Sequence, residues 1–160
     1  MIIMEEKTNV CRVLDKAKAD YKFHSFFART AVSGTEVAEI LGESVENVFK
    51  TLVTVGKSGN HYVFMVPVAE ELDLKKAAKA VGEKSIEMIK SKELLPLTGY
   101  VHGGCSPIGM KKRFRTVAHV SAAKREHILF SAGKIGCQIE TTFATLTKII
   151  PVELYDIVAE

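Results

Sequence analysis

Two apolar segments separated by a short polar loop constrain the fold of this chain more than any other feature of its sequence. Residues 49–55 and 62–68 are rich in β-branched and aromatic residues, which fit the pleated surface of a sheet. The loop between them, residues 56–60, contains glycines, and a glycine-containing loop of this length is typical of a β-hairpin. The chain is therefore expected to contain an antiparallel strand pair.

Helical periodicity occurs on both sides of this pair. Apolar residues recur at helical spacing in three segments: 10–17, 37–41 and 74–81. Ser33 and Glu36 match a capping box before the second helix, while Gly42 and Gly82 are suited to end the second and third helices. A further turn of helix should stop at Pro96, because proline lacks the backbone N–H of a helix interior. The shorter helical turns are expected at 91–95, 143–147 and 154–158.

The remaining apolar segments favour strands. They are expected at 21–27, 116–120, 127–130, 136–140 and 148–150. Helices do not alternate regularly with strands, so a doubly wound fold is not expected. No repeat or linker interrupts the 160 residues, a length typical of one domain. The prediction is a single α/β (α+β) domain over 1–160, with a mixed, largely antiparallel β-sheet or a barrel-like core flanked by helices.

The composition narrows the functional class. The three cysteines, Cys11, Cys105 and Cys137, are scattered and show neither a disulfide framework nor the spacing of a zinc site. We therefore expect no metal and no cofactor, and free thiols fit the reducing cytoplasm. The first residues do not resemble a signal peptide, and no apolar run approaches the ~20 residues that span a bilayer, so no membrane association is expected.

The charge distribution leaves nucleic-acid binding open. The net charge of +3 does not by itself indicate such a partner. Lys111, Lys112 and Arg113 nevertheless stand together, and such a group can contact phosphates. A solvated protein surface is the alternative interpretation of these residues.

A glycine-rich segment at 103–112 is the strongest candidate for a ligand-binding loop. Gly103 and Gly104 have no Cβ, so the backbone can approach a ligand and its N–H groups can converge on an anion or a carbonyl oxygen. The segment matches neither a P-loop nor a dinucleotide-binding fingerprint. A tight connection without a ligand is the alternative.

Two other features suggest chemistry less directly. Lys50 lies in an apolar strand, where its ammonium group can either reach solvent or occupy a pocket. Cys105 and His102 suggest a nucleophile and its base, although no acid that orients His102 can be identified. The segment 131–136 is either a hairpin turn or a second substrate-facing loop. The remaining histidines lack the spacing of metal ligands.

Four segments together resemble the YbaK family, which includes the editing domain of bacterial prolyl-tRNA synthetases. They are VFKTLV at 48–53, LDLKKAAKAVG at 72–82, TGYVHGGCSPIGMKK at 98–112 and FSAGKIGCQIE at 130–140. The resemblance extends over nearly the whole chain from Lys7 onward. It implies a mixed, barrel-like sheet flanked by helices and the hydrolysis of mischarged aminoacyl-tRNA.

The resemblance also implies roles for individual residues. Lys50 matches the lysine that holds the acceptor end of the substrate, and Gly103 matches a glycine whose backbone lies near the ester carbonyl. These two are the expected catalytic residues. The expected substrate-binding residues are Phe26, Thr51, Gly104, Ser106, Ser131, Gly133 and Gln138. Some family members carry tyrosine in place of Phe26 and aspartate in place of Gln138, so these two positions bear on amino-acid preference.

The stand-alone branch of the family implies Cys-tRNA(Pro) as substrate, with the substrate thiol attacking its own ester. The implied partners are aminoacyl-tRNA, for which Lys111, Lys112 and Arg113 are candidate contacts, and prolyl-tRNA synthetase. Two alternatives remain: deacylation of alanyl-tRNA(Pro), and a tRNA- or synthetase-binding module without catalysis.

Overall fold

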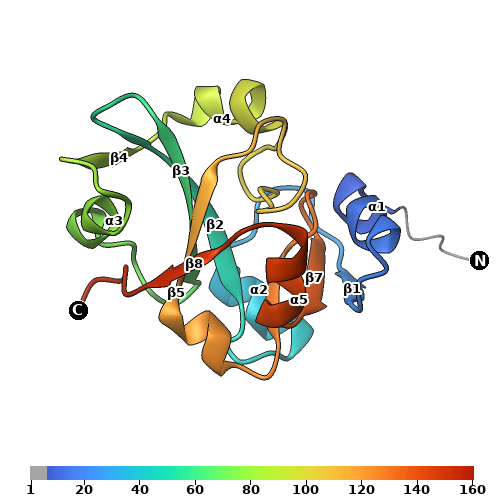
Figure 1. The fold of residues 1–160 in the computed structure, drawn as a ribbon. Coiled ribbons are helices and arrows are strands. Elements are labelled where there is room, and N and C mark those ends of the chain that lie inside the picture. Colours follow the sequence, from blue (N-terminus) through green and yellow to red (C-terminus); the bar gives the residue numbers. More distant parts are fainter. Residues whose placement is uncertain (1–6) are drawn as a thin grey trace, which may run out of the picture.

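Two β-sheets form the centre of the computed structural model, which describes residues 7–160 (Figure 1). The larger sheet has the strand order β4 (Ile86–Met88), β2 (Phe49–Gly56), β3 (His61–Pro67), β5 (Arg115–His119) and β8 (Glu153–Tyr155). The smaller sheet has the order β1 (Lys22–Ser25), β7 (Cys137–Thr141) and β6 (Ile128–Ser131). The pairs β3–β5 and β5–β8 are parallel and the others antiparallel, so the predicted mixed sheet is confirmed.

The two sheets meet where the chain enters β2. A parallel bridge joins Val48 to Leu129, and the Leu129 N–H donates to the Asn47 carbonyl at 2.8 Å. Over residues 7–160 the sheets do not close into a barrel, so the sheet alternative, rather than the barrel, describes this fold. This junction places the start of β2 beside the ends of β6 and β7.

The predicted hairpin of β2 and β3 is confirmed, and β3 is the central strand of the larger sheet. The Gly56 N–H donates to the Asn60 carbonyl at 2.8 Å and closes the turn. Successive side chains of β3 point to opposite faces, and both faces are buried. Phe64 packs on the side of α3 (Leu74–Val81), while Met65 packs into the core that contains α1 (Asn9–Lys16).

The predicted capping residues begin and end the helices as their chemistry suggests. The Ser33 hydroxyl accepts from the Glu36 N–H at the start of α2 (Gly34–Leu41). Asp73, which the sequence did not indicate as a cap, accepts from the Lys75 and Lys76 N–H groups in α3. Gly42 and Gly82 end α2 and α3 in the left-handed region, where a side chain would be strained. The helix predicted at 10–17 is α1.

Helix α4 (Ser91–Thr98) corrects the expectation that Pro96 would stop it. Proline costs the helix one N–H donor but its fixed φ is compatible with helical backbone. The last turn keeps other contacts, because the Gly99 N–H donates to the Leu95 carbonyl at 2.8 Å and the Thr98 hydroxyl to the Leu94 carbonyl at 2.7 Å. The helix therefore ends at Gly99, which has φ +86°.

The C-terminal segments were partly mispredicted. A strand was expected at 148–150, but α5 (Phe143–Ile149) begins at the Thr142 cap and occupies most of this segment. A helical turn was expected at 154–158, but residues 153–155 form β8, because they pair with the exposed edge of β5. The sequence also did not predict β4 or the short 3-10 helix Val120–Lys124.

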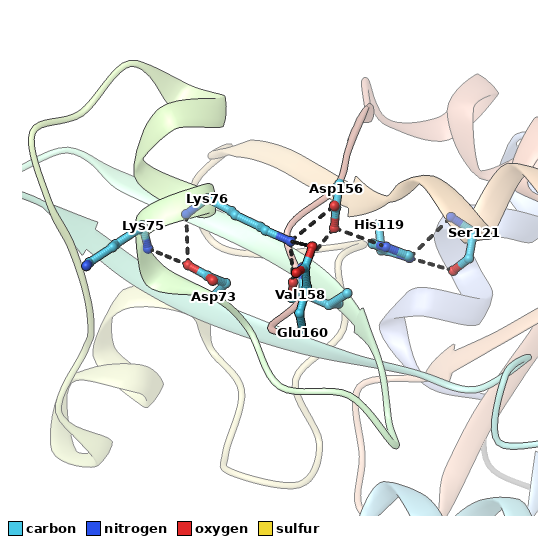
Figure 2. A network of polar contacts seen from close by, with 8 residues as sticks. All are labelled: Asp73, Lys75, Lys76, His119, Ser121, Asp156, Val158 and Glu160. Atoms are coloured by element: carbon cyan, nitrogen blue, oxygen red, sulfur yellow. Dashed lines mark hydrogen bonds and ion pairs between the residues drawn. The ribbon is translucent and has the colours of Figure 1, made fainter.

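A polar network ties the C-terminal segment to α3 (Figure 2). Lys76 contacts Asp156 at 3.1 Å and Glu160 at 3.7 Å, and His119 approaches Asp156 at 3.6 Å. Beside this network the Ala159 N–H donates to the Glu71 carbonyl at 2.9 Å. The C-terminal segment thereby supports the loop that carries Glu71.

The helices of residues 7–160 are all too short or too polar to span a bilayer.

Candidate functional site

A cavity of about 390 Å³ collects residues from both sheets and from three connecting segments. It lies between the start of β2, the N-terminal end of α2, the β4–α4 connection, the glycine-rich loop and the facing ends of β6 and β7. Of the predicted site residues it brings together Lys50, Thr51, Gly103, Ser131 and Gln138. Residues far apart in the sequence thus form one concave surface, which is the usual form of a small-ligand site.

Lys50 supplies a cation to this cavity. It lies in β2 opposite Val66, and its side chain is 28% exposed. The nearest carboxylate is that of Glu71, whose Oε1 is 3.8 Å from the Lys50 Nζ and whose side chain is 86% exposed. An ion pair with so exposed a partner contributes little stability, so an anionic ligand can replace Glu71 at small cost.

The glycine-rich loop is held rigidly by its own hydrogen bonds. The Tyr100 hydroxyl donates to the Ile108 carbonyl, and the Gly104 N–H donates to the Val101 carbonyl at 2.9 Å. Gly103 has φ +87°, and a Cβ at this position would lie 2.7 Å from the Ala31 Cβ. Within residues 7–160 no acceptor receives the Gly103 N–H, whereas the Gly104 N–H is occupied.

Two residues that line the cavity each contain a buried polar atom with no partner among residues 7–160. These atoms are the Thr51 Oγ1 and the Gln138 Oε1. Gln138 is 8% exposed and lies in β7 opposite Ser131 of β6 and His24 of β1. Leaving a buried polar atom unpaired costs about 1–3 kcal/mol. Both atoms are shielded from water here, so a ligand can bond to them only once their side chains turn toward the cavity.

Cys105 and His102 both line the cavity, but they do not form a nucleophile–base pair in this structure. The Cys105 thiol is buried, and burial raises its pKa to about 12. The thiol is consequently protonated near neutral pH, while the nucleophilic form of cysteine is the thiolate. No hydrogen bond joins Cys105 to His102 in the part of the chain that the structure describes.

Four of the predicted substrate-binding residues lie outside the cavity lining. Phe26 packs against a core cluster that includes Val37 and Leu129. Ser106 is fully buried, and its hydroxyl accepts from the Ile108 N–H at 3.3 Å. Gly104 and Gly133 allow close packing of the two loops: a Cβ on Gly104 would lie 3.1 Å from the Ile135 nitrogen, and one on Gly133 would lie 3.0 Å from the Tyr100 ring.

The hairpin predicted at 131–136 is confirmed, and a substrate-facing role of this segment stays a prediction. The segment is the hairpin connection between β6 and β7, in which the Ala132 N–H donates to the Cys137 carbonyl at 2.9 Å. Ser131 at its start also lines the cavity, where its hydroxyl accepts from the Gly133 N–H at 3.1 Å.

Lys111, Lys112 and Arg113 are exposed side chains. Lys112 and Arg113 border a second cavity of about 430 Å³, which also includes Phe114 and Ile150. Lys111 and Lys112 end the glycine-rich segment and Arg113 follows it, and none of the three lines the first cavity.

Sequence reasoning missed one wall of the first cavity. Ser33 and Gly34 contribute the N-terminal end of α2, and Lys90, Ser91 and Leu94 contribute the start of α4. A Cβ on Gly34 would lie 2.2 Å from the Val68 Cγ1, so α2 can approach the end of β3 only with glycine there. The capping box located this helix end, but no local pattern connects it with Lys50 or Gly103.

Comparison with known proteins identifies the family. The family model of the aminoacyl-tRNA editing domain matches residues 29–149. EbsC of Enterococcus faecalis, described as a candidate Cys-tRNA(Pro)/Cys-tRNA(Cys) deacylase, is 47% identical over 137 residues, or 85% of this chain and 84% of EbsC. A proline–tRNA ligase of Thermosipho africanus is 31% identical over 77 residues, which are 48% of this chain and 14% of the ligase.

A solved structure supports the same assignment. The crystal structure of a candidate trans-editing enzyme for prolyl-tRNA synthetase superposes with a TM-score of 0.79 and 25% identity. The match covers 88% of this chain and 87% of that enzyme. The resemblance noted in the sequence is thus confirmed, and this chain belongs to the aminoacyl-tRNA editing domain family.

Proposed function

We propose that this protein deacylates mischarged aminoacyl-tRNA in the cytoplasm, with Cys-tRNA(Pro) as its preferred substrate. One observation carries the proposal: a single cavity combines the Lys50 cation, the rigid Gly103 loop and two unpaired buried polar atoms, Thr51 Oγ1 and Gln138 Oε1. Its 47% identity to EbsC supports the reaction class and the substrate. The single domain of 160 residues contains the complete proposed site.

Lys50 binds the terminal phosphate of the acceptor end. The ammonium group exchanges the exposed Glu71 carboxylate, 3.8 Å away, for a phosphate oxygen. A partly dehydrated cation attracts an anion more strongly than a surface cation does, because the local dielectric is lower. Lys50 therefore fixes the ester relative to the glycine-rich loop.

The Gly103 backbone stabilises the charge that develops on the ester carbonyl. Its N–H has no acceptor in residues 7–160, and the loop is prevented from relaxing by the Tyr100 and Gly104 hydrogen bonds. A donor aimed in advance at an oxyanion contributes about 3–4 kcal/mol to transition-state stabilisation.

The substrate supplies its own nucleophile. Its thiol sulfur attacks the ester carbonyl carbon, a C–S bond forms, the bond to the ribose oxygen breaks, and the thiol proton passes to that oxygen. Water then opens the resulting thiolactone to release cysteine. Well-oriented intramolecular attack reaches effective molarities of about 10⁵–10⁸ M. This route requires no ionised protein thiol, in agreement with the raised pKa of Cys105.

Thr51 and Gln138 recognise the aminoacyl group. The Gln138 Oε1 accepts a hydrogen bond from the substrate α-ammonium, and the Thr51 hydroxyl bonds to a second polar atom of the aminoacyl end. Prolyl-tRNA synthetase is the proposed partner that delivers the tRNA, which the partial match to a proline–tRNA ligase supports.

A deacylation panel tests the proposal. We expect Cys-tRNA(Pro) to be hydrolysed fastest and Ala-tRNA(Pro) and Ser-tRNA(Pro) at least about 10-fold more slowly, since a pocket alone discriminates one small group by about 10–200-fold. Ser-tRNA(Pro) is the matched substrate, because it replaces only the sulfur. The measurement is the release of labelled amino acid from each charged tRNA.

The Cys105→Ala variant is the control for the reaction route. We expect it to retain most of the activity, and we expect no rise of wild-type activity with thiolate formation below pH 10, because the buried thiol has a pKa of about 12 and stays protonated there. An inactive Cys105→Ala variant would indicate a cysteine hydrolase. Binding of tRNA with all esters intact would indicate a non-catalytic module.

Thr51→Val should separate stability from function. Valine removes an unpaired buried oxygen, so the free energy of unfolding should stay constant or rise by about 1 kcal/mol. The KM for Cys-tRNA(Pro) should rise about threefold to tenfold, because this is the change in affinity expected from the loss of one hydrogen bond. The measurements are urea unfolding and deacylation kinetics.

Thr54→Val in the same strand is the matched control. The Thr54 hydroxyl donates to the Tyr62 carbonyl at 3.0 Å, so its loss should lower the free energy of unfolding by about 1 kcal/mol and leave KM unchanged. Equal destabilisation by both substitutions would show that the Thr51 hydroxyl has a partner in the free protein.

A further inference from the structure

A second cluster of polar side chains lies outside the catalytic cavity, where α2 meets the smaller sheet. Glu43 follows the end of α2, His127 precedes β6, and Glu140 lies in β7. One potential ligand atom from each of these residues lies within 4.8 Å of the others. The His127 Nε2 is 2.8 Å from the Glu43 Oε1. Histidine spacing in the sequence did not indicate this group, because its members come from three separate segments.

The two carboxylates are close together and mostly shielded from solvent. The side chains of Glu43 and Glu140 are 19% and 15% exposed. Two negative charges at this separation repel each other, and shielding from water strengthens the repulsion. His127 and His24 already contact these carboxylates at 2.8 Å, and a cation bound between them would reduce the repulsion further. Lys22 is 3.8 Å from Glu140, but its side chain is 75% exposed.

Each carboxylate is also held in place by a further donor. The Asn47 Nδ2 donates to the Glu43 Oε1 at 3.2 Å, and Asn47 is itself fixed by the Arg125 Nε at 2.6 Å. His24 in β1 contacts the Glu140 Oε1 at 2.8 Å. Metal sites in proteins carry such an outer layer of hydrogen bonds, which orients the ligating groups.

We propose that Glu43, His127 and Glu140 bind a divalent transition-metal ion, with Zn²⁺ as the best match. Zn²⁺ takes histidine nitrogens at about 2.0–2.1 Å and carboxylate oxygens at about 2.0–2.2 Å, and it tolerates an open fourth position. The imidazole ligand disfavours Mg²⁺ and Ca²⁺, which take oxygen ligands. Only small side-chain shifts are needed to bring three atoms within 4.8 Å around one such ion.

The proposed ion, with water as its fourth ligand, takes no part in the deacylation. It joins the end of α2 to β6 and β7, and it lies outside the cavity that holds Lys50 and Gly103. Glu140 and Gln138 are two residues apart in β7, so their side chains leave the same face of the strand. The ion would thereby restrain the strand that presents Gln138 to the cavity.

Metal titration of the metal-free, full-length protein tests this proposal. We expect isothermal titration calorimetry with Zn²⁺ to give one equivalent, and Co²⁺ to give the visible absorption of a low-symmetry site. His127→Gln should weaken Zn²⁺ binding by about 100-fold or more, and His24→Ala, which removes only an orienting contact, by about 10–100-fold. Zn²⁺ should also raise the Tm of the wild type.

Glu126→Gln is the matched control, because Glu126 is an exposed carboxylate next to His127. It should bind Zn²⁺ as the wild type does. Circular dichroism of each variant shows whether the fold is retained, and His127→Gln can still donate to Glu43. Failure of the wild type to bind Zn²⁺ or Co²⁺ would overturn the proposal, as would equal affinity in the wild type and His127→Gln, which would place the ion elsewhere.

Discussion

Replacing Lys50 with alanine is expected to lower kcat/KM for the deacylation of Cys-tRNA(Pro) by about 100- to 1,000-fold. The substitution removes the cation of β2 that faces the cavity and lies 3.8 Å from the displaceable Glu71 carboxylate. Without it the acceptor end loses both its charge partner and its position relative to Gly103. The measurement is the release of labelled cysteine at several tRNA concentrations, which separates kcat from KM.

Two variants make the Lys50 result interpretable. Lys50→Met removes the charge but keeps most of the length of the side chain, and it should lose activity to a similar extent. This comparison separates the effect of the lost charge from the effect of lost packing. Lys57→Ala removes an exposed lysine of the β2–β3 turn and should retain full activity. Wild-type kinetics in Lys50→Ala would disprove the assignment of the site.

Replacing Gly103 with alanine should damage both activity and stability. The residue has φ +87°, which costs an alanine roughly 1–2 kcal/mol. The added Cβ would also lie 2.7 Å from the Ala31 Cβ and 3.2 Å from the Ala31 Cα, so the loop must shift. Since a displacement of about 1 Å can cost 100-fold in rate, we expect kcat/KM to fall by about that factor.

Gly59→Ala provides the control for backbone strain alone. Gly59 has φ +92°, but a Cβ there would meet nothing within 4 Å. This variant should lose about 1–2 kcal/mol of unfolding free energy and keep its deacylation rate. If Gly103→Ala is as active as Gly59→Ala, the backbone of Gly103 has no role in the reaction.

Several features of the fold could be predicted because their causes are local. The β2–β3 hairpin follows from two β-branched segments around a glycine-containing turn, and its register is set by that turn. The capping of α2 by Ser33 and its end at Gly42 depend on residues only a few positions apart. These interactions join residues that are close together in the sequence, so the local sequence pattern predicts them.

The mispredicted elements depend on distant parts of the chain. Residues 153–155 form a strand because β5 offers an unpaired edge, although their local pattern suggested a helix. α4 is the exception, because it passes Pro96 through local bonds of its last turn to the Leu94 and Leu95 carbonyls. Local propensity is a weak preference, and tertiary pairing of this kind overrides it.

The same distinction between local and long-range causes applies to the candidate site. The sequence by itself determined which residues carry the family's motifs, and these included Lys50, Gly103, Ser131 and Gln138. Only the tertiary structure decided that their side chains and backbone line one cavity and that the Thr51 Oγ1 and Gln138 Oε1 are left unpaired there.

The glutamate–histidine cluster is the clearest case of a feature that only the fold creates. Glu43, His127 and Glu140 belong to three segments that no sequence motif connects, and the meeting of α2 with the smaller sheet brings them within 4.8 Å. A motif records the identity of neighbouring residues, whereas burial, unpaired atoms and ligand geometry depend on contacts between segments far apart in the chain.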